Sequence, residues 1–273
     1  MIDLVTIGET MAAMAPQEVG SLKYLNNFSK YIAGAESNVA IGVKRLGFNS
    51  GWISKLGKDP LGDYVEFFVR GEGVDVSQVK RDAKHRTGLM IKEMHTTKEP
   101  KIFYYRDNSA ASYLNKEDIN ADYIKKAKHL HLTGITPALS QSAQAAFFEA
   151  LRVAKENNLK ISFDPNLRLK LWDSIEKMRK VMLEIIPQVN VLLPGVEEGK
   201  ILLGLSDPEE IIKGFYEMMD PGSLIVLKIG SKGALYYQGD QIKHVDPYCV
   251  NNIVDLIGAG DAFAAGLITG LLR

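Results

Sequence analysis

The sequence predicts a three-layer α/β core with a parallel sheet, carrying a small β-sheet lid. Stretches with strand and helix patterns alternate along most of the chain, which is typical of a parallel sheet covered by helices on both faces. The chain has 273 residues, of which 46% are hydrophobic, enough for one such core. Residues 10–33 and 87–106 interrupt the alternation: the first range shows no clear helix, and the second predicts two strands around a polar turn.

Each element of the core has its own signal. The first strand alternates and ends in Gly8. The first helix has Val39, Val43 and Leu46 on one face, and Pro60 favours the start of the second helix. In order, we expect strands at residues 2–8, 50–57, 128–134, 159–164, 189–194 and 223–230, and helices at residues 36–47, 60–71, 140–158, 174–186 and 207–219.

These patterns predict two units. Residues 1–9, 34–86 and 107–273 would form the core, and residues 10–33 and 87–106 would form a discontinuous β lid inserted into it. Exposed lid strands can pair between subunits, so a homo-oligomer formed through the lid is a candidate assembly.

Composition narrows the partners and the compartment. Lysine plus arginine and aspartate plus glutamate both number 33, so the net charge of zero gives no electrostatic case for nucleic acid or an anionic membrane. The single cysteine, Cys249, excludes an internal disulfide and a cysteine-based zinc site. The N-terminus lacks the basic segment of a signal peptide, and the apolar run 262–272 is shorter than the roughly 20 residues that span a bilayer. We expect a cytoplasmic protein with a small-molecule substrate, and neither nucleic acid nor membrane as partner.

The stretch "GAGD" at residues 258–261 has the composition of an anion site. Gly258 and Gly260 allow the backbone to approach a ligand, and a helix start supplies unsatisfied N–H groups with partial positive charge. Together these features suit phosphate. Asp261 beside them can act as a general base toward an attacking hydroxyl. The same residues are also compatible with an ordinary helix whose dipole Asp261 complements. The third glycine of a dinucleotide-binding motif and the spacing of a P-loop are both missing.

The same stretch resembles the second signature of the ribokinase-like (PfkB) carbohydrate kinases, and "AGAESNVAIGVKRLG" at residues 33–47 resembles the first. The two signatures stand in the family's order on a matching α/β pattern, and the resemblance runs through essentially the whole chain. It implies the ribokinase-like fold and ATP-dependent phosphorylation of a sugar hydroxyl. Asp261 would be the catalytic base, beside an anion hole of Gly258, Ala259 and Gly260.

The resemblance also implies how the nucleotide and its metal are held. Mg²⁺ would be bound indirectly by Glu198 through water, and a monovalent cation is a further candidate. Ala33, Gly195 and Leu256 replace a glycine, an asparagine and a threonine of the family. The glycines in "KIGSKG" are equally compatible with a hairpin turn between two strands. The residues implied for ATP are Asn166, Arg168, Lys228, Gly230, Gly233, Gly258, Ala259 and Gly260.

The resemblance further implies a sugar-acid substrate. Ala13 stands where kinases of neutral sugars usually carry an aspartate that binds sugar hydroxyls. Arg106 and Arg168 can instead grip a carboxylate with their planar forks of donors. We therefore expect a keto-deoxy sugar acid. Met90 replaces an aromatic residue that some relatives carry. The residues implied for substrate binding are Gly34, Asn38, Met90, Tyr104, Arg106, Arg168 and Asp261.

Alternatives remain open at this point. A kinase of a neutral sugar such as fructose and a catalytically silent sugar or nucleotide sensor would share the fold. The two arginines are also compatible with exposed loop positions. Tyr104 and Tyr105 point to opposite faces of a strand, so one of them can bind substrate while the other packs.

Two further features complete the expectations. His129 and His131 alternate on one predicted strand, which indicates a core and an edge position rather than metal ligands. The sequence stops at Arg273 inside an apolar helix without a C-cap, whereas the family continues through further helices, so we expect either a fragment or a tail that is not represented.

Overall fold

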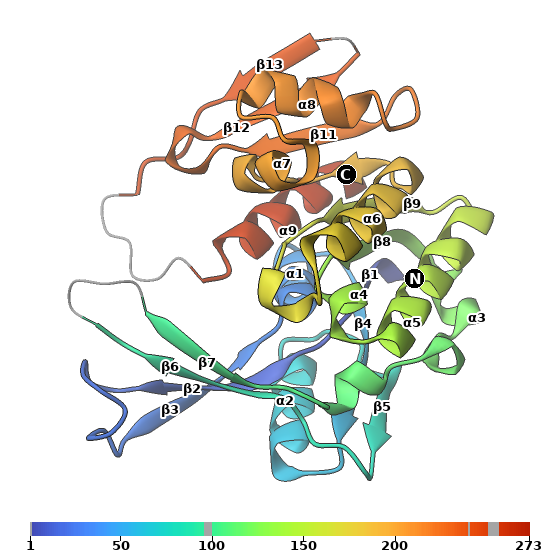
Figure 1. Ribbon diagram of the computed structural model, residues 1–273. Helices are drawn as coiled ribbons and strands as arrows, with labels where there is room; N and C mark the ends of the chain where they lie inside the picture. Colours follow the sequence, from blue (N-terminus) through green and yellow to red (C-terminus); the bar gives the residue numbers. More distant parts are fainter. Residues whose placement is uncertain (1, 96–99, 240, 251–256) are drawn as a thin grey trace.

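The main sheet runs through the centre of the molecule (Figure 1). The computed structural model describes residues 2–95, 100–239, 241–250 and 257–273. Within these residues nine strands pair in the order β13-β12-β11-β10-β9-β8-β1-β4-β5. The strands from β5 to β11 run parallel, and β12 and β13 extend the sheet as antiparallel strands. The bounds are β1 Ile2–Ile7, β4 Ser50–Gly57, β5 Val79–Asp82, β8 Ala127–Thr133, β9 Lys160–Asp164, β10 Val191–Leu192, β11 Leu224–Lys228, β12 Ala234–Gln238 and β13 Gln241–Val245.

Helices cover both faces of this sheet. One face buries Phe147, Met182 and Phe215 from α5, α6 and α8 against the strands. The other face packs against α1, α2 and α9, with Val39, Val65 and Ile268 in the cores. The α-helices are α1 Ala35–Arg45, α2 Pro60–Gly71, α3 Ala121–Ile124, α4 Thr136–Leu139, α5 Gln141–Glu156, α6 Ile175–Ile185, α7 Val196–Leu203, α8 Pro208–Tyr216 and α9 Ala259–Leu272; the 3₁₀ turns are η1 Ala110–Tyr113, η2 Lys116–Asp118, η3 Leu169–Leu171, η4 Ile186–Gln188 and η5 Gly230–Lys232.

Polar N-cap residues set the helix starts. Asp59 accepts a hydrogen bond from the Gly62 amide at 2.7 Å, directly before Pro60. Ser140, Ser174 and Asp207 cap α5, α6 and α8 in the same way. Such side chains satisfy N–H groups that the helix cannot pair. The helices expected at these positions are therefore confirmed to within a few residues at each end.

The lid is a separate sheet with the order β3-β2-β6-β7. Its strands are β2 Met11–Pro16, β3 Phe28–Ala33, β6 Leu89–Glu93 and β7 Lys101–Tyr105, and they project from one end of the core (Figure 1). The predicted fold class, a three-layer α/β core with a β lid, is confirmed. We propose that residues 10–33 and 87–106 act together as the lid unit. The two edges of the lid sheet are β3 and β7, and they are the strands that could pair with a second subunit. Such pairing stays a prediction.

Two expectations about the core need correction. The strand expected at residues 189–194 pairs regularly only over Val191–Leu192. It follows the 3₁₀ turn η4, whose Ile186 carbonyl accepts from the Val189 amide, and it ends before Pro194, which has no N–H to donate to the ladder. His129 and His131 are both fully buried, so neither lies at an edge. Each shares a hydrogen bond with Ser162 Oγ at 2.8 Å. Burial lowers their pKa values to about 4 and about 3, which keeps both rings neutral and structural.

The last helix packs closely against the first. A Cβ atom placed on Gly42 of α1 would lie 2.6 Å from Cβ of Ala265 in α9, so only glycine allows this approach. One turn earlier in both helices, Asn38 of α1 donates a hydrogen bond to Asp261 of α9. Within the described part of the chain, none of the helices has both the length and the apolar character needed to cross a bilayer.

Candidate active site

A cavity of about 710 Å³ lies between the inner face of the lid and the start of α9. It opens at the carboxyl ends of the central strands, where open α/β sheets bind ligands. Most of the residues that the sequence implies for catalysis, substrate, nucleotide and metal meet on its wall. They are Gly34, Asn38, Met90, Tyr104, Arg106, Asn166, Arg168, Glu198, Lys228, Gly258, Gly260 and Asp261.

The start of α9 forms one end of this cavity. Gly258, the N-cap, has φ +83°, a left-handed conformation that favours glycine. A Cβ atom on Gly260 would meet no heavy atom of the described residues within 4 Å, so the backbone there is open to a ligand. The first amides of a 14-residue helix thus face the cavity beside Asp261, an arrangement that suits a phosphate group.

Asp261 is held by the first helix of the core. Asn38 of α1 donates from Nδ2 to Asp261 Oδ2 at 2.8 Å. Burial raises the pKa of Asp261, and the Asp164 carboxylate raises it further, while the bond from Asn38 and the charges of Arg168 and Lys228 oppose that rise. A carboxylate whose pKa is moved toward neutrality is a stronger base than an ordinary aspartate.

Replacing Asn38 should move the pH dependence of catalysis. In Asn38→Ala the charged form of Asp261 loses a hydrogen bond, so the pKa of Asp261 should rise further. A protonated base is inactive, so the loss of kcat/KM on acidification should begin at a higher pH than in the parent. Ser37→Ala is the matched control, since Ser37 is a neighbour in α1 that bonds to Thr10 and Gly34 instead. Acid limbs that coincide in all three proteins would contradict the coupling.

Asp164 and Lys228 form a charged pair at the same end of the cavity. Lys228 Nζ lies 2.6 Å from Asp164 Oδ2, and the Asn166 amide donates to Oδ1 at 3.1 Å. Asp164 ends β9, and Lys228 ends β11. Parallel strands thus bring these groups to one edge. A lysine there can neutralise phosphate charge.

Glu198, implied above to bind Mg²⁺ through water, also has a structural role. Its Oε2 accepts from the Gly195 amide at 2.7 Å and its Oε1 from the Leu167 amide at 2.9 Å, which closes the start of α7. Burial and the Asp164 charge raise its pKa. Among the described residues, no three His, Cys, Asp or Glu side chains are close enough to hold a metal ion by themselves. A magnesium ion fits this end only with phosphate oxygens and water as additional ligands, which is its usual preference.

The lid supplies the opposite wall. Ala13, Met90 and Tyr104 lie side by side on β2, β6 and β7. Arg106 directly follows β7 and is buried, with its guanidinium 5.8 Å from the Tyr104 ring. Gly34 has a packing role too, because a Cβ atom there would lie 2.4 Å from Thr10 Oγ1.

The remaining implied residues differ in whether they line the cavity. Arg168 is exposed on the cavity wall and donates only to the neighbouring Leu167 carbonyl among the described contacts. Ala259 lies in the first turn of α9 but does not line the cavity. Gly230 and Gly233 lie away from it, in the hairpin that joins β11 to β12. The two glycines thus form a hairpin turn, and a nucleotide contact at them stays a prediction. Leu256 lies outside the described residues.

Three charged residues of the cavity were missed by sequence reasoning: Glu9, Lys92 and Asp164. Glu9 and Asp164 follow or end core strands, which was the available signal. Lys92 lies on β6 two residues beyond Met90 and therefore on the same face of the strand, so strand alternation was the available signal for it.

Comparison with known proteins shows the family. The model of the pfkB family carbohydrate kinases matches residues 1–273, and the chain belongs to this family. It is a sugar kinase, a phosphotransferase with an alcohol group as acceptor. It is 40% identical over 272 residues to the 2-dehydro-3-deoxygluconokinase of Bacillus subtilis, covering 99% of this chain and 83% of the relative. It is 33% identical to fructokinase-1 of Oryza sativa subsp. japonica, with coverage of 99% and 83%.

A solved structure gives the same result in three dimensions. A protein described as a ribokinase II from E. coli, in complex with ATP and Mg²⁺, superposes with a TM-score of 0.90 at 27% identity. The match covers 99% of this chain and 86% of that chain.

Proposed function

We propose that this protein transfers the γ-phosphoryl group of ATP to the terminal hydroxyl of 2-keto-3-deoxygluconate, as a 2-dehydro-3-deoxygluconokinase. The observation that carries the proposal is a buried arginine, Arg106, in the same cavity as Asp261, with Arg168 on the same wall. A keto-deoxy sugar acid has a carboxylate for the arginines at one end and a hydroxyl for Asp261 at the other. The likeness to the enzyme of B. subtilis supports this substrate.

The transfer assigns a task to each group at the α9 end. Asp261 takes the proton of the terminal hydroxyl, whose oxygen forms a bond to the γ-phosphorus. The bond between that phosphorus and the β–γ bridging oxygen breaks, and its electron pair leaves on ADP. The amides of Gly258 to Asp261 and the Lys228 ammonium stabilise the charge on the transferred group.

Magnesium bound with ATP would supply further charge neutralisation at the phosphates. Glu198 and Asp164 are the carboxylates that could hold it, through water, at the end where they lie. Asn166 and Arg168 line the same wall and would contact the nucleotide. A requirement for a monovalent cation stays a prediction.

One observation favours a second candidate, phosphorylation of a neutral sugar such as fructose. Arg106 is already paired with Glu9, so its charge is partly neutralised before any substrate binds. The likeness to fructokinase-1 points the same way. Against it stands Ala13 on the inner face of the lid, which cannot accept hydrogen bonds from sugar hydroxyls.

The test is an ADP-release assay with ATP and Mg²⁺ on a panel of 2-keto-3-deoxygluconate, gluconate, fructose and ribose. We expect the highest kcat/KM on 2-keto-3-deoxygluconate. A preference for fructose would replace the proposal by its second candidate. Release of ADP with none of the sugars, together with measurable ATP binding, would indicate a silent sensor.

A further inference from the structure

Glu9 lies where the chain passes from the core into the lid, and it contacts residues of two other such passages. Its side chain is only 1% exposed and forms an ion pair with Arg106, which follows β7. Ser109 donates from Oγ to Glu9 Oε1 at 2.5 Å. A Cβ atom on Gly88, just before β6, would approach Glu9 Oε1 to 2.7 Å. Three lid passages therefore meet around one carboxylate.

The ion pair shares a wall with the proposed substrate site. Both Glu9 and Arg106 line the cavity between the lid and the start of α9. Glu9 engages Nη2 of the guanidinium, whereas the buried Nε has no hydrogen-bond partner among the described residues. Because the guanidinium is planar and rigid, fixing one nitrogen also fixes the direction of the other donors. Glu9 therefore fixes the orientation in which Arg106 lines the cavity.

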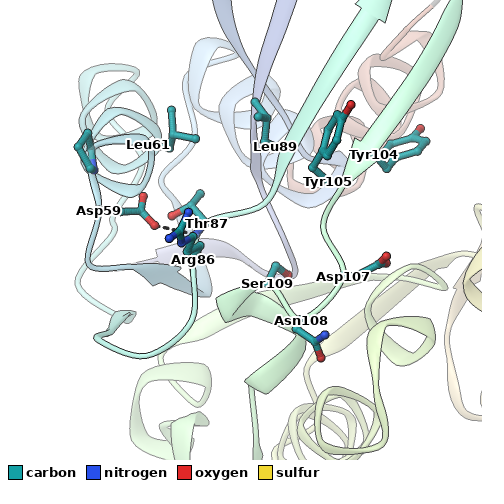
Figure 2. A pocket seen from close by; sticks show the side chains of 11 residues that line it. Asp59, Leu61, Arg86, Thr87, Leu89, Tyr104, Tyr105, Asp107, Asn108 and Ser109 are labelled. Carbon is teal, nitrogen blue, oxygen red and sulfur yellow. Dashed lines mark hydrogen bonds between the residues drawn. The ribbon is translucent and has the colours of Figure 1, made fainter.

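A different contact anchors the neighbouring lid passage. Asp59, the N-cap of α2, accepts from the Thr87 amide at 2.8 Å (Figure 2). Thr87 Oγ1 in turn accepts from the Gly57 amide at 3.0 Å. These bonds hold the chain directly before Gly88 without Glu9. The carboxylate is therefore not required to attach that passage to the core, and a neutral residue of equal size can replace it.

We propose that Glu9 is a positioning residue that sets the affinity for the substrate carboxylate by fixing the guanidinium of Arg106. The inference rests on the proposed function, in which Arg106 binds that carboxylate. An arginine freed from Glu9 would populate several rotamers, and the substrate would have to order it at an entropic cost. Glu9 also compensates the charge of Arg106, which lets the arginine stay buried before the substrate arrives.

The expected signature is a change in KM rather than in kcat. The arginine contact exists in the bound substrate and in the transition state alike, so its loss weakens both equally. Glu9→Gln keeps the volume and an acceptor for Ser109 but removes the charge. It should raise KM for 2-keto-3-deoxygluconate about tenfold or more, the size of a charge-assisted hydrogen bond, with kcat nearly unchanged. Glu9→Asp should recover part of the loss.

A double-mutant cycle makes the test specific. In an Arg106→Ala background, Glu9→Gln should add no further rise in KM, because its effect passes through the arginine. Asp118→Asn is the matched control: Asp118 pairs with Lys55 at 2.5 Å, with side chains 14% and 12% exposed, away from the cavity. It should lower the melting temperature without raising KM. Equal effects of Glu9→Gln in both backgrounds would overturn the proposal.

Two provisions keep the result decisive. If Glu9→Gln shows no folding transition, Ser109→Ala replaces it, because that change removes the hydrogen bond to Glu9 Oε1. A smaller rise in KM that disappears in the Arg106→Ala background supports the proposal. A rise in KM that persists in that background overturns it. If the parent prefers a neutral sugar, the proposed substrate fails, and the same cycle is measured on that sugar. Coupling between Glu9 and Arg106 would then retain the positioning role, and independence would remove it.

Discussion

Asp261→Asn should lower kcat by about 100- to 10,000-fold, the usual cost of losing a general base. Asparagine keeps the size of the side chain, but it cannot take the proton of the attacking hydroxyl. Its amide can still meet Asn38, whose Nδ2 now lies 2.8 Å from Asp261 Oδ2. The change should therefore fall on the chemical step. The measurement is steady-state kcat in the ADP-release assay, with the preferred sugar of the parent.

Binding and stability separate this outcome from a folding defect. The amides of Gly258 and Gly260 are unchanged in Asp261→Asn, so calorimetry should give nearly the parental affinity for ATP with Mg²⁺. The pKa of Asp261 is raised, which means that its ionised form is disfavoured in the folded protein; a neutral asparagine should not destabilise it. Turnover within a few-fold of the parent would show that Asp261 serves only as a residue of the helix start.

The alternation of hydrophobic patterns was sufficient to predict most of the core because the inner parallel strands are buried on both faces, whereas the edge strand β5, which has no fully buried residue, was not predicted. Ile53 on β4 and Leu130 on β8, for example, are fully buried in the core. Helix starts were predictable because Asp59 and Ser140 cap locally, within three residues of the amides they satisfy. Such short-range signals survive in the sequence. The shortening of β10 also had local causes, the turn η4 before the strand and the missing N–H of Pro194 after it.

The site was only partly predictable, because several of its contacts join distant residues. The pairs Glu9–Arg106 and Asp164–Lys228 are 97 and 64 positions apart in the sequence, and neither has a spacing that announces it. A lone Glu after a first strand does not reveal which arginine it will meet. The family resemblance identified the motifs of the site but gave no sign that Arg106 would be buried beside a carboxylate.

Arg106 and Arg168 should carry the discrimination between a sugar acid and a neutral sugar. A charge-assisted hydrogen bond contributes roughly 1.5–3 kcal/mol, so removing either arginine should cost about 10- to 150-fold in kcat/KM for 2-keto-3-deoxygluconate. The smaller loss is expected at Arg168, which is exposed and screened by water. The loss should be absent for fructose, which has no carboxylate. Arg→Lys should rescue only in part, because the planar fork is lost.

Arg106→Ala needs a second variant as its control, because it leaves the buried Glu9 carboxylate without its ion-pair partner. Breaking a buried ion pair by removing one partner typically costs about 3–5 kcal/mol of stability. The double change Glu9→Gln with Arg106→Ala removes both charges, so it should recover thermal stability while keeping the loss of kcat/KM on the sugar acid. The measurements are melting temperature and kcat/KM on 2-keto-3-deoxygluconate and fructose for the parent, Arg106→Ala, Arg168→Ala and the double variant. Equal losses on both sugars would reject the carboxylate assignment, since a general defect in the cavity does not distinguish an acid from a neutral substrate.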